Sequence, residues 1–337
     1  MSPDLVNLLR QQDAGISEAS DSRMVVDHFG DVQHEINALN ESAVVCPLLD
    51  HICIRATGKD RAKFLHNFCT NNINDLESGQ ICEAFFCDVK AKVIAHGYIL
   101  AGDEAHEIWM LPGDGETLLN HLNRYLITED VTLTSVSEER TTFAVAGPQT
   151  LSVLSALGNV DALSVSGCSM QADNIMLLTT WNDLPTAFVS VRNDIAVDTW
   201  NELTSEATAA GDATFQHLRI LEGYPIIGKD LTRDNLAPEA DRNSVAISYT
   251  KGCYLGQEPI ARLDAMGHVN RKLFKGWATI ADDAQDDEQL PIVTSRSMTA
   301  DASFPVLLPL SMKLAANSDS LIARINGGAT VRLDRLV

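Results

Sequence analysis

The apolar residues of this chain follow two different patterns, and the change between them limits the folds that the chain can adopt. Up to about residue 210, runs with the two-residue period of strands alternate with runs at helical spacing. Beyond about residue 270 no convincing helix pattern follows, and short strand-type runs are separated by turns. A chain of 337 residues is also too long for one ordinary core. We therefore expect an α+β protein of several domains that ends in a small all-β module.

The patterns predict individual elements in both α+β parts. In the first part a strand over 51–57 precedes a helix with Asp60 as its N-cap. The other elements expected there are strands of one sheet over 82–86, 93–100 and 107–111 and a helix over 118–126. The second part is expected to hold strands over 131–136, 142–146, 174–180 and 186–191 and helices over 151–157 and 195–209.

Residues 251–258 read Lys-Gly-Cys-Tyr-Leu-Gly-Gln-Glu and concentrate more chemistry than any other stretch. The two glycines allow backbone paths and close approaches that a side chain would block. Lys251 can favour the thiolate of Cys253, which is the reactive form of cysteine. A helix beginning near Pro259 would add to this effect through its free N–H groups. A lone cysteine is more often a buried core residue, but polar residues surround this thiol on both sides. We therefore predict that Cys253 is a functional thiol.

This stretch resembles the signature of the YgfZ-type folate-binding proteins, which are relatives of the aminomethyltransferase (T-protein) of the glycine cleavage system. The matching residues are Lys251, Gly252, Cys253, Tyr254, Gly256, Gln257 and Glu258, with Leu255 at the variable position. The flanking stretches 221–230, 237–240, 260–262 and 271–273 are also similar, as are 58–65 and 70–71. The resemblance spans roughly residues 45 to 280, and only 251–258 is highly specific.

The resemblance implies a fold and a domain layout. Two α+β domains and a small C-terminal β-barrel are expected around a central folate pocket. The first domain, which carries the signature loop, would comprise residues 23–140 together with 218–270. The second would comprise 141–217, and the barrel module 271–337.

The resemblance also implies a ligand and residue roles. The ligand would be tetrahydrofolate or a one-carbon derivative, and the protein would assist iron–sulfur cluster assembly or maintenance through Cys253, tuned by Lys251. Gln257 and Glu258 would hold the loop by hydrogen bonds, while Gly252 and Gly256 would let the backbone take its path. Folate needs an apolar slot, a group that reads the pterin and a cation for its tail. The candidates for these contacts are Arg219, Glu222 and Arg262, although a structural ion pair explains Arg219 equally well.

The T-protein mechanism is put in doubt by one departure from the family pattern. The T-protein has two glycines, two further residues and two aspartates, and the matching stretch here begins at Ala91 and ends with Ala95 and His96. Alanine accepts neither a proton nor a hydrogen bond. His96 could replace the carboxylate, although a strand histidine is more often a core or surface residue. A folate-dependent aminomethyltransferase or other one-carbon transferase therefore stays an alternative, beside a non-enzymatic adaptor that docks partner proteins.

The net charge limits the kinds of partner that the protein is expected to bind. A formal net charge of −21 disfavours nucleic acid, because phosphate contacts need clustered Lys and Arg. Residues 251–275 depart from this trend, with five cations against two carboxylates and a local balance of +3. That stretch predicts either a small anionic ligand or an ordinary solvated surface. Folate, and possible iron–sulfur client or assembly proteins, are therefore the expected partners.

The number and spacing of the cysteines and the length of the apolar runs indicate in which compartment the protein is expected. Seven cysteines cannot all pair internally, and neither Cys46 with Cys53 nor Cys82 with Cys87 has the spacing of a zinc or ferredoxin site. Core thiols and no permanent metal are therefore expected. The apolar runs are shorter than a membrane helix needs, and the N-terminus lacks a secretory signal. The expected location is the cytoplasm, without a membrane partner.

Overall fold

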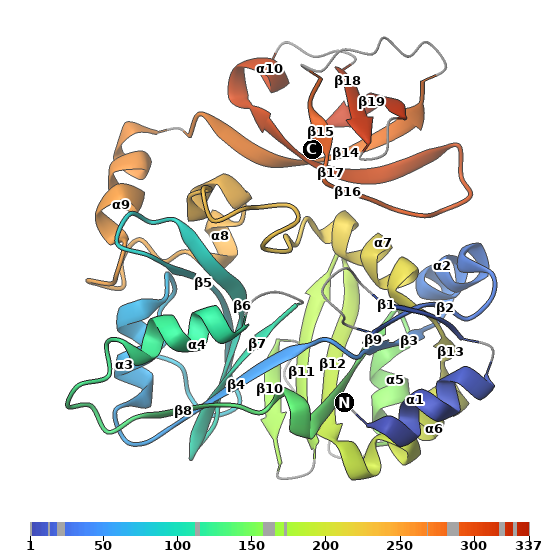
Figure 1. Ribbon diagram of the computed structural model, residues 1–337, viewed down its shortest axis with the longest axis horizontal. Helices are drawn as coiled ribbons and strands as arrows, with labels where there is room; N and C mark the ends of the chain where they lie inside the picture. The colour runs from blue at the N-terminus through green and yellow to red at the C-terminus, as the bar shows by residue number, and fades with distance from the viewer. Residues whose placement is uncertain are drawn as a thin grey trace.

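In a computed structural model of the chain, the strands of the described residues form four sheets (Figure 1). The residues that are not described are 1, 13, 19–23, 112–114, 158–165, 172–173, 268, 282–289, 317–320, 326–328 and 337. Within the part that is described, no helix is long and apolar enough to cross a membrane.

The first large sheet is five-stranded and antiparallel, with the order β5-β6-β7-β4-β8. Its strands are β4 (Ile52–Thr57), β5 (Ile81–Cys87), β6 (Val93–Ala101), β7 (Ala105–Met110) and β8 (Thr132–Ser135). The helices α3 (Arg61–Phe68) and α4 (Gly115–Asn123) bury Phe64, Leu65, Leu118 and Leu122 against this sheet. The predicted strands and both helices of this part are present close to their expected bounds. The strand predicted over 131–136 was assigned to the wrong part, because it pairs with β4 as β8 of this sheet. Only β4 shows alternating apolar residues, at Ile52, Ile54 and Ala56. β5, β6 and β7 are buried along most of their length, because one face of the sheet packs on the helices and the other on the second sheet.

Asp60 occupies the N-cap position of α3, as predicted, but its side chain does not cap the helix. Its carboxylate accepts a hydrogen bond from the backbone N–H of Asp130 instead, at 2.9 Å. The carboxylate therefore ties the start of α3 to the loop before β8.

The second large sheet has six strands in the order β10-β11-β12-β9-β3-β13, and only the β13–β3 pair is parallel. The strands are β3 (Val44–Leu48), β9 (Arg140–Ala146), β10 (Gly167–Met170), β11 (Asn174–Trp181), β12 (Leu184–Arg192) and β13 (Thr208–Ala209). The elements packed around them are α1 (Pro3–Gln11), α2 (Val32–Glu41), α5 (Thr150–Ser155), α6 (Ala196–Glu206), α7 (Asp212–Glu222) and the hairpin of β1 (Gly15–Glu18) and β2 (Met24–His28).

Two helices of this part, α2 and α7, were not predicted, because polar residues interrupt their apolar periodicity. In α7 the buried face includes His217 and Arg219, and α2 buries Glu35. Strand β3 also lies within the segment 23–140 that the sequence assigns to the first domain, yet it pairs with β9 of the second sheet. The domain boundaries themselves stay a prediction.

The C-terminal sheet has six strands in the order β15-β18-β19-β14-β17-β16 and curls into a nearly closed barrel (Figure 1). The strands are β14 (Arg271–Ile280), β15 (Ile292–Val293), β16 (Ser295–Arg296), β17 (Ser303–Ser311), β18 (Leu321–Ile325) and β19 (Thr330–Leu336). The expectation of no helix here was wrong in one place, because α10 (Met312–Ala316) follows β17. The predicted class, α+β with a C-terminal β-barrel, is confirmed.

A long connection runs from α7 to β14 and lies along the β5 edge of the first sheet (Figure 1). It contains the short helix α8 (Asn243–Ala246), the 10-residue helix α9 (Gln257–Met266) and the 3-10 turn η4 (Ala237–Ala240). Other 3-10 turns are η1 (Ser137–Glu139) and η3 (Asn193–Ile195). The signature stretch 251–258 therefore lies between α8 and α9, beside the first sheet.

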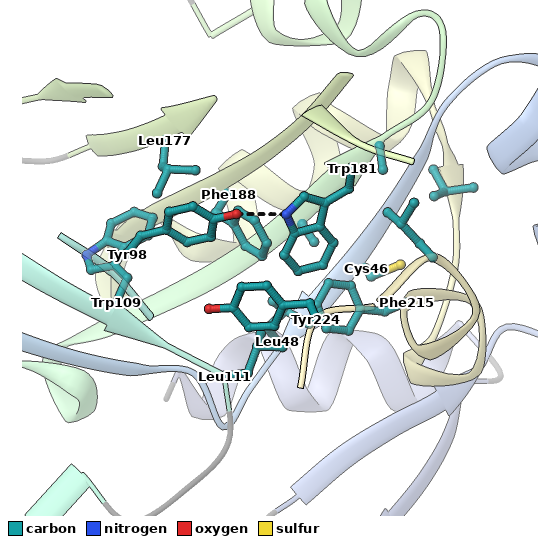
Figure 2. Close-up of a cluster of buried hydrophobic side chains, with 14 of the residues drawn as sticks. Cys46, Leu48, Tyr98, Trp109, Leu111, Leu177, Trp181, Phe188, Phe215 and Tyr224 are labelled. Atoms are coloured by element: carbon teal, nitrogen blue, oxygen red, sulfur yellow. Dashed lines mark hydrogen bonds between the residues drawn. The ribbon is translucent and has the colours of Figure 1, made fainter. Parts of the chain in front are cut away.

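The two large sheets meet at a buried aromatic cluster (Figure 2). Its aromatic members come from both sheets and from the region of α7, and they are Tyr98, Trp109, Trp181, Phe188, Phe215 and Tyr224. The Trp181 indole donates a hydrogen bond to the Tyr98 hydroxyl at 2.8 Å and so joins β11 to β6. This junction is the part of the core that positions the candidate site.

A buried ion pair joins the barrel to α7. The Arg219 guanidinium donates to the Asp230 carboxylate at 2.7 Å, and both side chains are fully buried. Asp230 also accepts from the hydroxyls of Thr294 and Ser295, at 2.8 and 2.6 Å. One carboxylate therefore connects α7, the loop that follows it and the barrel.

We expect Asp230→Ala to lower the free energy of unfolding by about 3–5 kcal/mol, because it leaves the Arg219 charge buried without a partner. The control is Lys59→Ala at the exposed pair with Asp130, whose N–O distance is 3.9 Å; it should change stability by less than about 1 kcal/mol. Urea unfolding of the whole chain measures both. An Asp230 variant as stable as the control would contradict this role of the pair.

Candidate functional site

The signature loop presents one exposed thiol. Of the seven cysteines, five are buried, Cys82 is half-buried and Cys253 is exposed. Gly252 and Gly256 both have positive φ, at 96° and 82°, where a side chain would be strained. A Cβ at Gly256 would lie 2.5 Å from the carbonyl oxygen of Asp88, so the backbone there requires glycine. The loop is therefore pressed against the β5–β6 turn while its thiol faces outward.

Lys251 contacts backbone carbonyls. Its ammonium donates to the carbonyl oxygens of His66, Cys69 and Asn71, the last two at 2.7 Å. The thiol that it approaches is that of Cys69, at 3.8 Å. Burial lowers the pKa of Lys251 and also raises that of Cys69. The expected tuning of Cys253 by Lys251 therefore stays a prediction, and the observed contacts fix the end of α3.

The other signature residues complete the loop. Tyr254 is buried, and its ring lies 4.9 Å from the Lys251 ammonium. The backbone N–H of Leu255 donates to the carbonyl of Asn67 at 2.9 Å. Gln257 is half-buried at the start of α9 and Glu258 is exposed, so the loop-holding role proposed for their side chains stays a prediction. The helix begins two residues before Pro259, close to where the sequence placed it.

A small cavity lies in the aromatic cluster between the two large sheets (Figure 2). Its free volume is about 10 Å³, room for about one water molecule. It is lined by His51, Tyr98, Trp109, Leu111, Leu177, Trp181, Phe188 and Tyr224. Burial lowers the pKa of His51 to about 3, so this ring is neutral at pH 7. Burial also raises the pKa of both Tyr98 and Tyr224. The cavity is thus a small, neutral, aromatic slot, and its side chains would have to move before a flat ring could enter it.

A buried ionic network lies behind the tyrosines of this slot. The Arg242 guanidinium makes a two-point contact with the Glu83 carboxylate and also donates to Glu222 at 3.0 Å. The same guanidinium lies 5.3 Å from the centre of the Tyr224 ring. Burial opposes the ionisation of Glu83, but the charges and hydrogen bonds of His96 and Arg242 outweigh it and lower the pKa of Glu83 to about 2.

His96, at the position of a T-protein aspartate, belongs to this network. Its Nε2 lies 2.7 Å from Glu83, and its ring is stacked between Phe85 and Tyr224. Burial lowers the pKa of His96, so the ring is neutral and its Nε2 proton is donated to the ionised carboxylate. His96 therefore holds Glu83 in place through Nε2, while its buried Nδ1 has no hydrogen-bond partner among the described residues.

The three predicted folate contacts lie in different places. Glu222 belongs to the Arg242 network, and its carboxylate also accepts from the backbone N–H of Asn182 at 2.8 Å. Arg219 is fully buried and donates to the carbonyl of Tyr224 at 2.6 Å, so its contacts fix one wall of the slot. Arg262 is exposed on α9. Glu222 and Arg219 thus lie behind Tyr224, which lines the slot, but neither of them lines it.

The basic stretch 251–275 is largely paired. Arg271 contacts Glu239 at 3.0 Å and Lys272 contacts Asp241 at 2.6 Å. The Lys275 ammonium donates to the carbonyl of Leu221 at 3.1 Å, and that of Lys251 donates to the carbonyls at the end of α3. Most of the local positive charge therefore neutralises neighbouring groups, and the ordinary-surface interpretation of this stretch gains support over an anion site.

Sequence reasoning did not identify Glu83 and Arg242. The two residues are 159 positions apart, and no local motif marks either of them. The one available signal was the occurrence of Trp109 and Trp181 in strands, since these large rings line the slot. Within the described residues, no group of three or more His, Cys, Asp or Glu side chains could hold a metal ion.

Comparisons with known proteins place the chain among proteins of this architecture. The family described as the GCVT N-terminal domain matches residues 6–180. A putative chloroplastic transferase of Arabidopsis thaliana is 30% identical over 263 residues, which make up 74% of this chain and 59% of the plant protein. The match thus spans less than two thirds of that relative. The tRNA-modifying protein YgfZ of Colwellia psychrerythraea is 22% identical, over 66% of this chain and 67% of that protein.

Among solved structures, the aminomethyltransferase T of the glycine cleavage system from Bartonella henselae has the same fold. The two structures agree with a TM-score of 0.84 over 98% of this chain and 95% of that chain. Their sequences are 14% identical, so the likeness establishes the fold alone.

The low pKa of Glu83 predicts a specific pH dependence. The folded state keeps Glu83 ionised below its ordinary pKa of 4.5, so its contribution is complete above pH 4.5 and is lost as pH falls towards about 2. Glu83→Gln should cost about 3 kcal/mol at pH 7 and give a flatter stability profile in this acid window. Urea unfolding between pH 2 and pH 7 measures both effects. The control is Glu104→Gln at an exposed carboxylate, and a Glu83 profile parallel to the control would contradict the assignment.

Proposed function

Because this chain belongs to the GCVT N-terminal domain family, as a YgfZ-type member of the aminomethyltransferase superfamily, we propose that it binds tetrahydrofolate or a one-carbon derivative of it. The family is a folate-binding one. We further propose that Cys253 helps to assemble or maintain iron–sulfur clusters in particular enzymes. In this proposal the folate is an exchangeable ligand, which binds and dissociates.

The observation that carries the folate proposal is the neutral aromatic slot backed by Glu83, Arg242 and Glu222. A pterin is flat, and its ring edge offers several N–H donors that a carboxylate can accept. Glu83 Oε2 accepts only the Arg242 bond among the hydrogen bonds described, which leaves it a free lone pair. The free volume of the slot, about 10 Å³, is far below the roughly 300 Å³ of a typical ligand pocket. Side chains around it must therefore move to admit the whole ligand.

The proposal for Cys253 is supported by contrast with the other six cysteines. Burial raises the pKa of each of them, which keeps them as unreactive thiols. Only Cys253 combines exposure with a glycine-bounded loop. An exposed thiol can meet a cluster or a sulfur atom on another protein, so iron–sulfur client or assembly proteins are the proposed partners.

The second candidate is a folate-dependent aminomethyltransferase or other one-carbon transferase, which the name of the plant relative and the shared fold favour. Ala95 and His96 count against it, because His96 is committed to Glu83 and Ala95 has no acidic group. An assay that follows transfer of the methylene carbon from an aminomethyl-lipoyl carrier protein to tetrahydrofolate, with release of ammonia and the reduced lipoyl carrier, separates the two candidates. Robust turnover would favour the transferase.

The names of the bacterial relatives mention tRNA modification. With a net charge of −21, this chain is poorly suited to hold tRNA by its phosphates. We propose that any link to tRNA runs through an enzyme that the protein serves. The cytoplasmic location stays a prediction.

Tetrahydrofolate should bind the purified protein in isothermal titration, and Glu83→Gln should weaken the binding by at least about tenfold, since one charge-assisted hydrogen bond is lost. Lys59→Gln, at a lysine whose side chain is 76% exposed and does not line the slot, is the matched control and should bind as the wild type does. If wild-type protein shows no binding at millimolar folate, the folate proposal is wrong.

Replacing Cys253 with Ser should leave folding unchanged, because the side chain is exposed, and should abolish the support of iron–sulfur enzymes. The measurement is the activity of such enzymes in cells that carry only the variant, beside thermal unfolding of the purified protein. Ser244→Ala on the exposed surface of α8 is the control. Full activity with the Cys253 variant would show that the thiol has no such role.

A further inference from the structure

Lys251 and His66 contact each other reciprocally, although they are 185 residues apart. The Lys251 ammonium donates to the carbonyl oxygen of His66, while Nε2 of the His66 ring lies 3.1 Å from the carbonyl oxygen of Lys251. The side chain of each residue is thus hydrogen-bonded to the backbone carbonyl of the other. His66 lies in the last turn of α3, and Lys251 begins the signature loop.

The neighbours of His66 determine its tautomer. Its Nδ1 accepts from the backbone N–H groups of Ile73 and Asn74, at 3.2 and 3.4 Å. A ring nitrogen that accepts carries no proton, so the single proton of the neutral ring is on Nε2. Burial lowers the pKa of His66, and the nearby Lys251 charge adds to that effect. The ring is therefore a neutral donor to the Lys251 carbonyl.

Further contacts hold the two sides of the loop to the same short segment, residues 67–71. The N–H of Leu255 donates to Asn67 and the N–H of Ser248 donates to Thr70, both at 2.9 Å. The Thr70 hydroxyl donates to Ala246 at 2.6 Å. Between these anchors, a Cβ at Gly252 would meet nothing within 4 Å. Cys253 thus stands in open space on a backbone that is fixed on both sides.

From this geometry we propose that Lys251 and His66 form a clamp, in which both act as positioning residues that hold the Cys253 loop in the orientation needed to meet a partner protein. The inference rests on the proposed function of Cys253. It gives Lys251 a mechanical role, through three carbonyls, in place of the expected tuning of the thiol. It also assigns a role to His66, which the signature does not include.

Two substitutions of His66 distinguish its hydrogen bond to the Lys251 carbonyl from its hydrogen bonds to Ile73 and Asn74. His66→Gln keeps a donor at the Nε2 position for the Lys251 carbonyl, and His66→Asn keeps an acceptor at the Nδ1 position for Ile73 and Asn74 but lacks the donor. Only His66→Gln therefore keeps the hydrogen bond from the side chain of residue 66 to the Lys251 carbonyl. Lys251→Met removes the ammonium while it keeps a long apolar side chain over the Tyr254 ring.

The test places a nitroxide on Cys253, the one exposed cysteine, and records its mobility in the full-length protein. The immobilised spectral component should be present in the wild type and in His66→Gln and lost in His66→Asn and Lys251→Met. In cells, the activity of iron–sulfur enzymes should fall about tenfold with the last two variants, since each loses at least one clamp hydrogen bond. The His66→Gln variant should rescue it.

An unchanged spectrum in Lys251→Met, with a shift in the pH at which Cys253 alkylation is half-maximal, would overturn the clamp in favour of thiol tuning. Equal mobility in the two His66 variants would also overturn it, and this comparison decides the matter even if Lys251→Met fails to fold. The mobility measurement needs neither folate nor a client enzyme. A negative mobility result would therefore contradict the clamp alone. Failure of the proposed function would be seen separately, with the Cys253→Ser variant.

Discussion

The ion pair between Arg242 and Glu83 is the interaction on which the candidate site depends. Glu83 belongs to β5 of the first sheet, and Arg242 immediately precedes α8 in the connection to the barrel. Through Glu222 the same guanidinium reaches the end of α7. Burying either charge alone would cost much free energy, so each of the two buried charges stabilises the other. The sheet, the long connection and the slot are therefore fixed relative to one another at this point.

This arrangement places the slot and the thiol on one continuous stretch of chain. Arg242 touches the ring of Tyr224, which lines the slot, and α8 then leads to Lys251 and Cys253. Asn71 links the first sheet to the long connection, because its side-chain amide donates to the carbonyls of Glu83 in β5 and Val245 in α8. The buried Arg242–Glu83 pair and the loop that carries Cys253 are therefore linked through Asn71 and α8.

Much of the fold follows from local pattern, and most of the site does not. In the first sheet, β4 could be predicted because its apolar residues alternate, and β5, β6 and β7 because they are short apolar runs. The signature loop could be predicted because its glycines and cysteine are unusual together. The α7 helix escaped prediction because Arg219 and His217 are buried where apolar residues are normally expected. The pairing of Glu83 with Arg242, and of Lys251 with the end of α3, joins residues more than 150 positions apart. Such contacts leave no trace in sequence spacing.

The positions of the four tryptophans have a practical consequence. Trp109 and Trp181 line the slot from opposite sheets, Trp200 is buried beside Phe29 and Phe143, and Trp277 is 38% exposed on the barrel. Each part of the molecule therefore carries its own intrinsic fluorophore. The Trp181 indole is bonded to the Tyr98 hydroxyl of the other sheet, so its surroundings change if the two sheets separate. Variants that each keep a single tryptophan would therefore follow the slot, the second sheet and the barrel one at a time, without any added label.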